Sequence, residues 1–255
     1  MALSTNSIMH YTKNFKNLCG ILESGFSVKY CKEEFLFGEE THLRFAYPMV
    51  CFCDIPLSNV KNHLKSYGHY GIGLTKEWAT QKKLNPVLYL ENYSSLTTSI
   101  LGQAQRIAKN KSDISSNQDV DIIDNVWLQD LLTLSSFMKN YEGNLIRNKV
   151  ITNYRFYDER EWRYVPTSNE LCDNLRAINI NDYIKYKNEY NQKVGQIKLN
   201  FDNTKDITYI IVRNEKDIHR FIKFITSKFK KKLTEFDIEI LMTKILTTKQ
   251  ITNDL

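Results

Sequence analysis

The order of apolar segments along the chain is the feature that most restricts its fold. Segments with the two-residue period of a strand are interspersed with segments of helical period. They do not follow the regular strand–helix–strand rhythm of parallel α/β proteins. The run Ile207–Arg213, ITYIIVR, is apolar almost throughout and is typical of a buried strand. This order predicts an α+β protein.

We predict a single α+β domain over residues 1–255, built on a split, antiparallel-rich sheet. A chain of 255 residues that is 42% hydrophobic fits one large globular domain. A helical insertion is expected at residues 94–142, and further helices at the C-terminal end, residues 214–255. Residues 30–45, with scattered aromatic and charged side chains, are expected to form a loop. The predicted strands lie near residues 8, 50, 70, 88, 160, 197 and 209.

Several classes of protein are disfavoured by the sequence. No apolar run approaches the roughly 18 residues of a membrane span, and the N-terminal segment lacks the pattern of a signal peptide. We therefore expect a cytoplasmic protein. The odd number of cysteines, 5, argues against a disulfide framework.

Cys51 and Cys53 alternate along an apolar run, so both thiols should point to one face of a strand. Buried structural cysteines are the favoured interpretation. A metal site with His63 and His69 is the alternative, but no second CxxC or HxxxH supplies further ligands at zinc-site spacing. We expect no metal.

The chain has a net charge of +6, and its clearest basic cluster is Lys228, Lys230, Lys231 and Lys232. A solvated helix end and a nucleic-acid contact both fit this cluster. Gly71 and Gly73 occupy alternate positions of a predicted strand, which indicates that something approaches one face of it closely.

The segment DEREWRY, residues 158–164, carries the strongest candidate chemistry. On a strand, alternation puts Glu159, Glu161 and Arg163 on one face, and Trp162 on the other face toward the core. Two carboxylates two positions apart lie roughly 6–7 Å apart at the backbone, and in a dry site one pKa would rise. An ion-pair ladder with the arginine is the structural alternative.

Three stretches resemble the AbiGi family of bacterial abortive-infection proteins. They are HYTKNFKNLCGILESGF (10–26), PMVCFCDIPLSNVKNHLKSYGHYGIGLTKEWATQKKLNPVLYL (48–90) and FYDEREWRYVP (156–166). The resemblance covers most of residues 8–165 and extends weakly through the DITYIIVR strand. It implies phage defence beside a protein partner encoded nearby, since members of the family are commonly described as the antitoxin half of a pair.

A second resemblance is more distant. An opening His-x-Thr strand, a helix ending in Gly and a later Glu-x-Glu pair are similar to DarT-like and other ADP-ribosyltransferases. That resemblance implies an ADP-ribosyltransferase-like fold with NAD as co-substrate. The implied residues are Glu161 as catalytic residue with Glu159 beside it, His10 and Thr12 at NAD, Tyr11 or Tyr70 against the nicotinamide, and Arg44 at the pyrophosphate.

Three hypotheses about function follow, of which the third is a nuclease or nucleic-acid binder that uses the charge of the Lys228–Lys232 run and the ring of Phe229. In the first, the chain is an NAD-dependent transferase acting in phage defence, whose acceptor (protein, nucleic acid or water) is open. In the second, it is a non-catalytic antitoxin or partner-binding subunit, with Glu161 paired to Arg163 and His10 buried. A cleft that unites His10 with Glu161 would favour the enzyme, whereas an exposed apolar patch would favour the binding protein.

Overall fold

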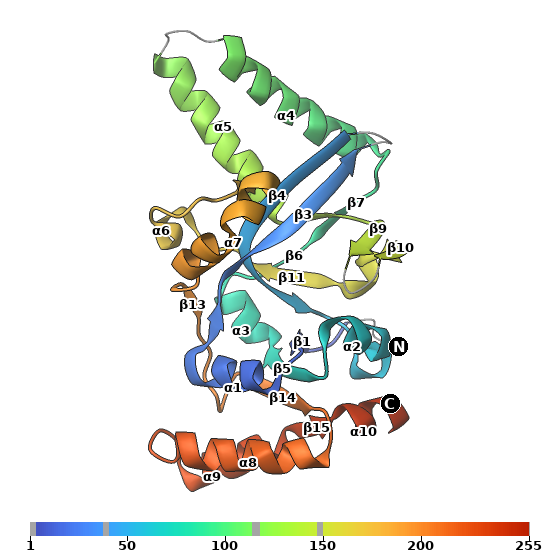
Figure 1. Ribbon diagram of the computed structural model, residues 1–255, viewed down its shortest axis with the longest axis vertical. Helices are drawn as coiled ribbons and strands as arrows, with labels where there is room; N and C mark the ends of the chain where they lie inside the picture. Colours follow the sequence, from blue (N-terminus) through green and yellow to red (C-terminus); the bar gives the residue numbers. More distant parts are fainter. Residues whose placement is uncertain (1–3, 38–40, 114–117, 147–149, 255) are drawn as a thin grey trace.

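The computed structural model describes residues 4–37, 41–113, 118–146 and 150–254. A mixed sheet runs through the middle of the molecule, and helices gather at both of its ends (Figure 1). The prediction of an α+β protein is confirmed. The helices are α1 (Phe15–Ser24), α2 (Lys61–Tyr67), α3 (Lys76–Gln81), α4 (Ser95–Asp113), α5 (Gln118–Ser136), α6 (Ser168–Leu171), α7 (Ile180–Val194), α8 (Glu215–Phe229), α9 (Glu235–Thr243) and α10 (Thr248–Asp254), with 3-10 turns η1 (Leu57–Asn59) and η2 (Phe156–Glu159).

The described residues form one nine-stranded sheet in which every pair of strands is antiparallel except β14 with β15. The expected antiparallel-rich sheet is thus present. Its order is β15 (Ile245–Thr247), β14 (Ile207–Val212), β5 (Tyr70–Thr75), β1 (Ser7–Thr12), β4 (Thr41–Cys53), β11 (Glu161–Tyr164) and β6 (Asn85–Pro86), with β3 (Lys29–Phe37) and β12 (Ile178–Asn179) also paired to β4.

Two strands expected in the main sheet lie outside it. The strand near residue 88 is β7 (Leu88–Leu90), which pairs in parallel with β8 (Met138–Asn140). The strand near residue 197 is β13 (Lys198–Leu199), which pairs with β2 (Phe26–Ser27). The main sheet ends at β6 instead, where Pro86 has no N–H to donate to a further strand.

The prediction of a loop at residues 30–45 is wrong, because β3 and the first part of β4 form a long hairpin. Their register runs from Lys29 opposite Met49 to Phe37 opposite Thr41. Along β3, Glu33 and Phe35 are buried, whereas Lys32 and Glu34 are exposed and Leu36 is half-buried, which is the period of a strand. A glutamate at an inward position hid this pattern in the sequence.

Strand β4 connects the two halves of the sheet. Its first part pairs with β3 and β12, and its last residues pair with β1 and β11. Cys53 lies opposite Met9 on one side and opposite Glu161 on the other. Because directly opposed residues share a face, Met9, Cys53 and Glu161 all point to the same side.

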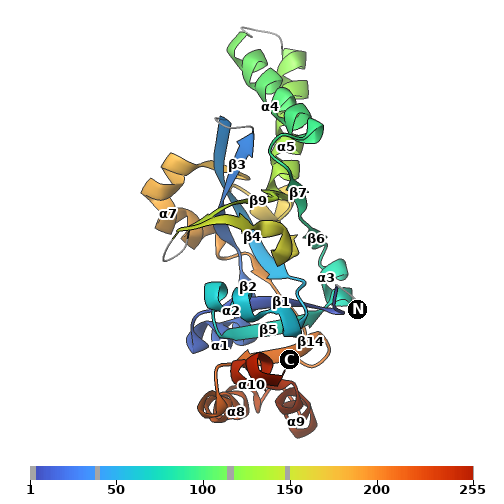
Figure 2. The same cartoon turned by 90° about the vertical axis from the view of Figure 1, so that its right-hand side faces the viewer.

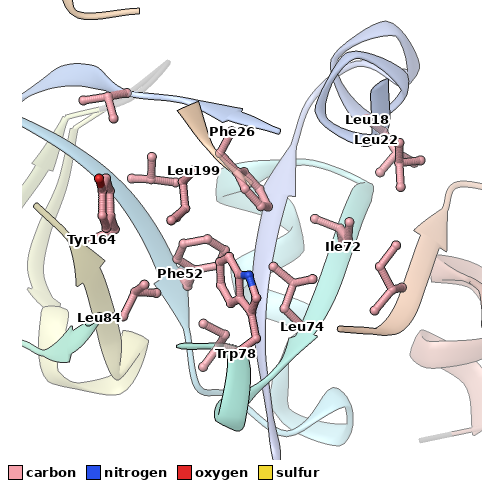
Figure 3. Close-up of a cluster of buried hydrophobic side chains, with 14 of the residues drawn as sticks. Leu18, Leu22, Phe26, Phe52, Ile72, Leu74, Trp78, Leu84, Tyr164 and Leu199 are labelled. Atoms are coloured by element: carbon pink, nitrogen blue, oxygen red, sulfur yellow. The ribbon is translucent and has the colours of Figure 1, made fainter. Parts of the chain in front are cut away.

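The main core covers the other face of the sheet. Figure 3 shows Phe26, Phe52, Leu74 and Trp78 packed together there. The indole N–H of Trp78 is satisfied by the carbonyl oxygen of Asn200 at 3.1 Å. Trp162 is half-buried against this core, as predicted.

The C-terminal helices lie under the β14–β15 edge, and the α4–α5 hairpin projects from the opposite end of the molecule (Figures 1 and 2). Strand β14 and helix α8 follow the predicted strand and helix. The helices expected over residues 214–255 are interrupted at Ile245–Thr247, because this segment forms β15 and pairs with β14. Among the described residues, no helix has the length and apolarity needed to cross a membrane.

The two glycines of β5 are explained by the side chains of β1. A Cβ at Gly71 would lie 2.8 Å from the Tyr11 ring, and a Cβ at Gly73 would lie 2.7 Å from the Met9 sulfur. The close approach expected at one face of this strand therefore comes from the protein itself.

We expect Gly71→Ala to lower the free energy of unfolding by about 1–3 kcal/mol, because the buried Tyr11 ring must shift. Urea unfolding followed by circular dichroism measures the change. Gly20→Ala in α1 is the control, since its Cβ meets nothing within 4 Å and alanine favours a helix. Equal stability of the two variants would contradict the packing described.

Candidate functional site

The DEREWRY segment forms a 3-10 turn followed by a strand. Turn η2 ends at Glu159, Arg160 takes a left-handed conformation with φ of 45°, and β11 begins at Glu161. The expected continuous strand is therefore interrupted at Arg160. The two carboxylates still meet, because both bind the same ammonium group of Lys139.

Five buried or largely buried charged side chains form a chain of alternating sign. Lys139 Nζ lies 2.7 Å from Glu161 Oε2 and 3.0 Å from Glu159 Oε2. Arg163 donates from Nε to Glu161 Oε1 at 2.7 Å and from Nη2 to Glu33 Oε1 at 2.6 Å. We call Glu159, Lys139, Glu161, Arg163 and Glu33 the charge chain.

Neutral groups complete the hydrogen bonding of the charge chain. Arg163 Nη1 donates to the carbonyl oxygens of Ser136 at 2.7 Å and Met138 at 3.2 Å. Glu159 Oε1 accepts from the hydroxyls of Tyr67 and Tyr154. Because burying a charge is costly unless it is paired and hydrogen-bonded, this saturation makes the cluster tolerable inside the protein.

The electrostatics keep Glu161 ionised. Burial alone would raise the pKa of Glu161, but the charges of Arg163 and Lys139 outweigh it and hold this pKa well below its usual range. Glu33 behaves differently, because burial raises its pKa more than Arg163 lowers it. Both oxygens of Glu161 are occupied by cations, so the carboxylate is arranged as an ion-pair partner rather than as a free base.

The structure does not bring His10 to the charge chain. His10 lies on the core face of the sheet, with its ring 5.1 Å from the Phe26 ring and 5.6 Å from the Phe52 ring. Its Nδ1 donates to the carbonyl oxygen of Cys51 at 2.8 Å. Burial lowers the pKa of His10, which favours the neutral imidazole. His10 and Glu161 therefore point to opposite faces of the sheet.

Other implied NAD-binding residues are also separated from the carboxylates. The Tyr70 hydroxyl donates to Asp217 Oδ2 at 2.7 Å on the core side, and Thr12 Oγ1 accepts from Asn17. Arg44 lies within β4, not in a loop, and pairs with the exposed Glu34.

Tyr11 is the implied ligand-binding residue that shares a face with Glu161. Its ring lies 5.4 Å from His63, which stacks on Tyr67 at 4.1 Å, and the Tyr67 hydroxyl reaches Glu159. The buried Tyr11 hydroxyl has no hydrogen-bond partner among the described residues. Those residues also contain no group of three His, Cys, Asp or Glu side chains placed to hold a metal ion.

Sequence reasoning missed Lys139 and Glu33, although they hold the two carboxylates and Arg163. Lys139 is separated from Glu161 by 22 residues, and Glu33 from Arg163 by 130. No local spacing links such distant positions. The only usable signal was chemical, since two carboxylates beside one arginine need a further cation if they are buried.

The chain is similar to proteins of a known family over most of its length. The model of a family described as "Putative abortive phage resistance protein AbiGi, antitoxin" matches residues 24–213, about three quarters of the sequence. The chain belongs to the AbiGi family. The matched stretch contains every member of the charge chain, so this network lies within the family region.

A curated AbiGi relative supports the assignment. The chain is 29% identical over 237 residues to "Abortive phage resistance protein AbiGi" of Lactococcus lactis subsp. cremoris, covering 85% of this chain and 92% of the relative. The predicted family is thus confirmed, and with it membership of a phage-resistance family. No solved structure matches, so the expected ADP-ribosyltransferase-like fold has no structural relative to support it.

We expect Lys139→Met to lower the free energy of unfolding by about 3–5 kcal/mol, because Glu159 and Glu161 then face each other without their shared cation. Urea unfolding at neutral pH measures it. Lys193→Met on the exposed side of α7 is the control and should change stability by less than about 0.5 kcal/mol. If Lys139→Met and Lys193→Met changed the free energy of unfolding by equally small amounts, the charge chain would contribute nothing to stability.

The lowered pKa of Glu161 also predicts a pH dependence. A carboxyl with a lowered pKa stabilises the folded state above its unfolded pKa of about 4.3, and this contribution is lost as the pH falls toward the folded pKa. The difference in unfolding free energy between the native protein and Glu161→Gln should be constant above about pH 6 and should shrink below about pH 4. A difference independent of pH between about 3 and 7 would contradict the ion pairing.

Proposed function

We propose that this AbiGi protein is the non-catalytic antitoxin of a two-component abortive-infection system and neutralises a toxin by binding it. The observation that carries the proposal is the state of the two candidate catalytic glutamates. Both are buried, both share Lys139, and His10 points to the opposite face of the sheet. The family description, which includes the word antitoxin, supports the same conclusion.

A binding protein needs an accessible surface with apolar anchors, and helix α5 offers one. Trp127 is 56% exposed and Leu134 is 63% exposed. They are seven residues apart, which is about two helical turns, so they lie on one side of α5. Tryptophan is enriched among the residues that dominate binding energy at protein interfaces. We assign the toxin contact to this side of the α4–α5 hairpin.

The experiment is a growth assay in which the toxin encoded beside this chain is expressed alone or with it. We expect coexpression to restore growth and the two proteins to copurify. Trp127→Ala with Leu134→Ala should weaken the complex by about 30-fold or more. Ile184→Ala with Tyr186→Ala, which removes two exposed apolar residues from α7, should leave it unchanged. Toxicity that this chain does not relieve would refute the proposal.

An NAD-dependent ADP-ribosyltransferase is the second candidate. The Glu-x-Glu pair and the unpartnered buried hydroxyl of Tyr11 on the same face favour it. Incubation with labelled NAD, alone and with lysate of infected cells, tests this function beside Glu161→Gln. Label transfer or nicotinamide release that disappears in this variant while its fold persists would replace the antitoxin proposal with this one.

A further inference from the structure

The positive charge of the chain is concentrated in one segment. Residues 213–232 contain eight lysines and arginines and two acidic residues. The excess of positive charge in this segment equals the net charge of +6 of the whole chain. The basic and acidic residues of the rest of the chain are therefore equal in number. Most of this segment is helix α8, which lies beyond the stretch matched by the family model.

The helix separates apolar and basic residues on opposite sides. Phe221, Ile225 and Phe229 are buried against the body of the protein. Lys216, Lys223 and Lys230 recur every seven residues and are all exposed. Two helical turns separate neighbours in this row, so their Cα atoms lie roughly 10.5 Å apart along one side.

Some charges of the segment are already used within the protein. Asp217 pairs with Arg220 at 2.9 Å and with Arg213 at 3.6 Å, and Lys228 lies 3.8 Å from Glu23. In the described part of the chain, no ion pair involves the exposed lysine row or the adjoining Lys231 and Lys232. We call Lys216, Lys223, Lys230, Lys231 and Lys232 the basic face.

We propose that the basic face binds the phosphate backbone of nucleic acid. Protein interfaces depend on aromatic and other apolar anchors, with lysine depleted, and the exposed lysine row of α8 has no such anchor between its members. Phosphate contacts need cations and hydrogen-bond donors, which lysines supply without reading sequence. The observations therefore favour nucleic acid over an acidic protein.

The position of the basic face allows it to act separately from the proposed toxin contact. Helix α8 and the α4–α5 hairpin lie at opposite ends of the molecule (Figures 1 and 2). A nucleic acid held along α8 would leave Trp127 and Leu134 accessible. Loss of nucleic-acid binding and loss of toxin neutralisation can therefore be distinguished in the same protein.

The test is fluorescence anisotropy with labelled probes of arbitrary sequence: duplex DNA of about two helical turns, duplex RNA of equal length, and a single strand. We expect micromolar or tighter binding to at least one probe at about 50 mM salt. If about four phosphates are neutralised, binding to duplex DNA should weaken on the order of 100-fold at about 200 mM salt. The ranking of the probes identifies whether DNA or RNA is the ligand.

The matched variants reverse three lysines on each of two helices. Lys216→Glu, Lys223→Glu and Lys230→Glu together should weaken binding at least about tenfold. Lys185→Glu, Lys187→Glu and Lys193→Glu on α7 make the same change in net charge at exposed positions and should leave affinity within about twofold. If the α8 variant loses its circular dichroism spectrum, the corresponding Lys→Gln variant replaces it.

Three outcomes would overturn the proposal. The first is no binding of any probe at low salt by the native protein. The second is an equal loss in the α7 and α8 variants, which would show that only total charge matters. The third is displacement of the probe by polyglutamate at an equal concentration of charges as effectively as by unlabelled nucleic acid, which would assign the face to acidic proteins.

Discussion

The buried pairing of Arg163 with Glu161 and Glu33 is the interaction on which the centre of the structure depends. Arg163 is fully buried, so its charge must be compensated inside the protein. Glu33 comes from the β3–β4 hairpin, Glu161 from the same strand as Arg163, and Lys139 from β8. The requirement to pair these charges fixes how three distant segments meet, because each unpaired member would leave a buried charge uncompensated.

The same constraint limits the chemistry that this region can perform. The register of β11 with β4 puts Glu161 and Cys53 on one face of the sheet, whereas Phe52 and His10 lie on the other. An aromatic core covers the face of His10, whereas the charge chain and an apolar cluster with Met9, Tyr11 and Cys53 cover the face of Glu161. A ligand that needed His10 and Glu161 together would have to pass through the sheet. The resemblance of short motifs to a transferase therefore does not extend to a shared arrangement of those side chains.

Much of the fold could be predicted from the sequence, but less of the site. The uninterrupted apolar run of β14 and the helical period of α8 identified those elements, because each pattern lies within one segment. The pairing of Glu161 with Arg163 was open to prediction for the same reason. Lys139 and Glu33 were not, because only the fold brings them close. The strand period of β1 is enough to show that His10 and Tyr11 point to opposite faces of the sheet. Which of them shares a face with Glu161 follows only from the register of Met9 with Cys53, which the sequence does not give.

In this AbiGi protein Glu159 and Glu161 are held in buried ion pairs, and the two surfaces that we propose for binding lie at opposite ends of the molecule. The central claim is that Lys139 and Glu161 stabilise the fold through each other. A double-mutant cycle on unfolding free energy, with Lys139→Met, Glu161→Gln and both together, measures this directly. The account predicts a coupling energy of at least about 1.5 kcal/mol. Additive effects, with a coupling below about 0.5 kcal/mol, would contradict it and would reopen the assignment of Glu161 to catalysis.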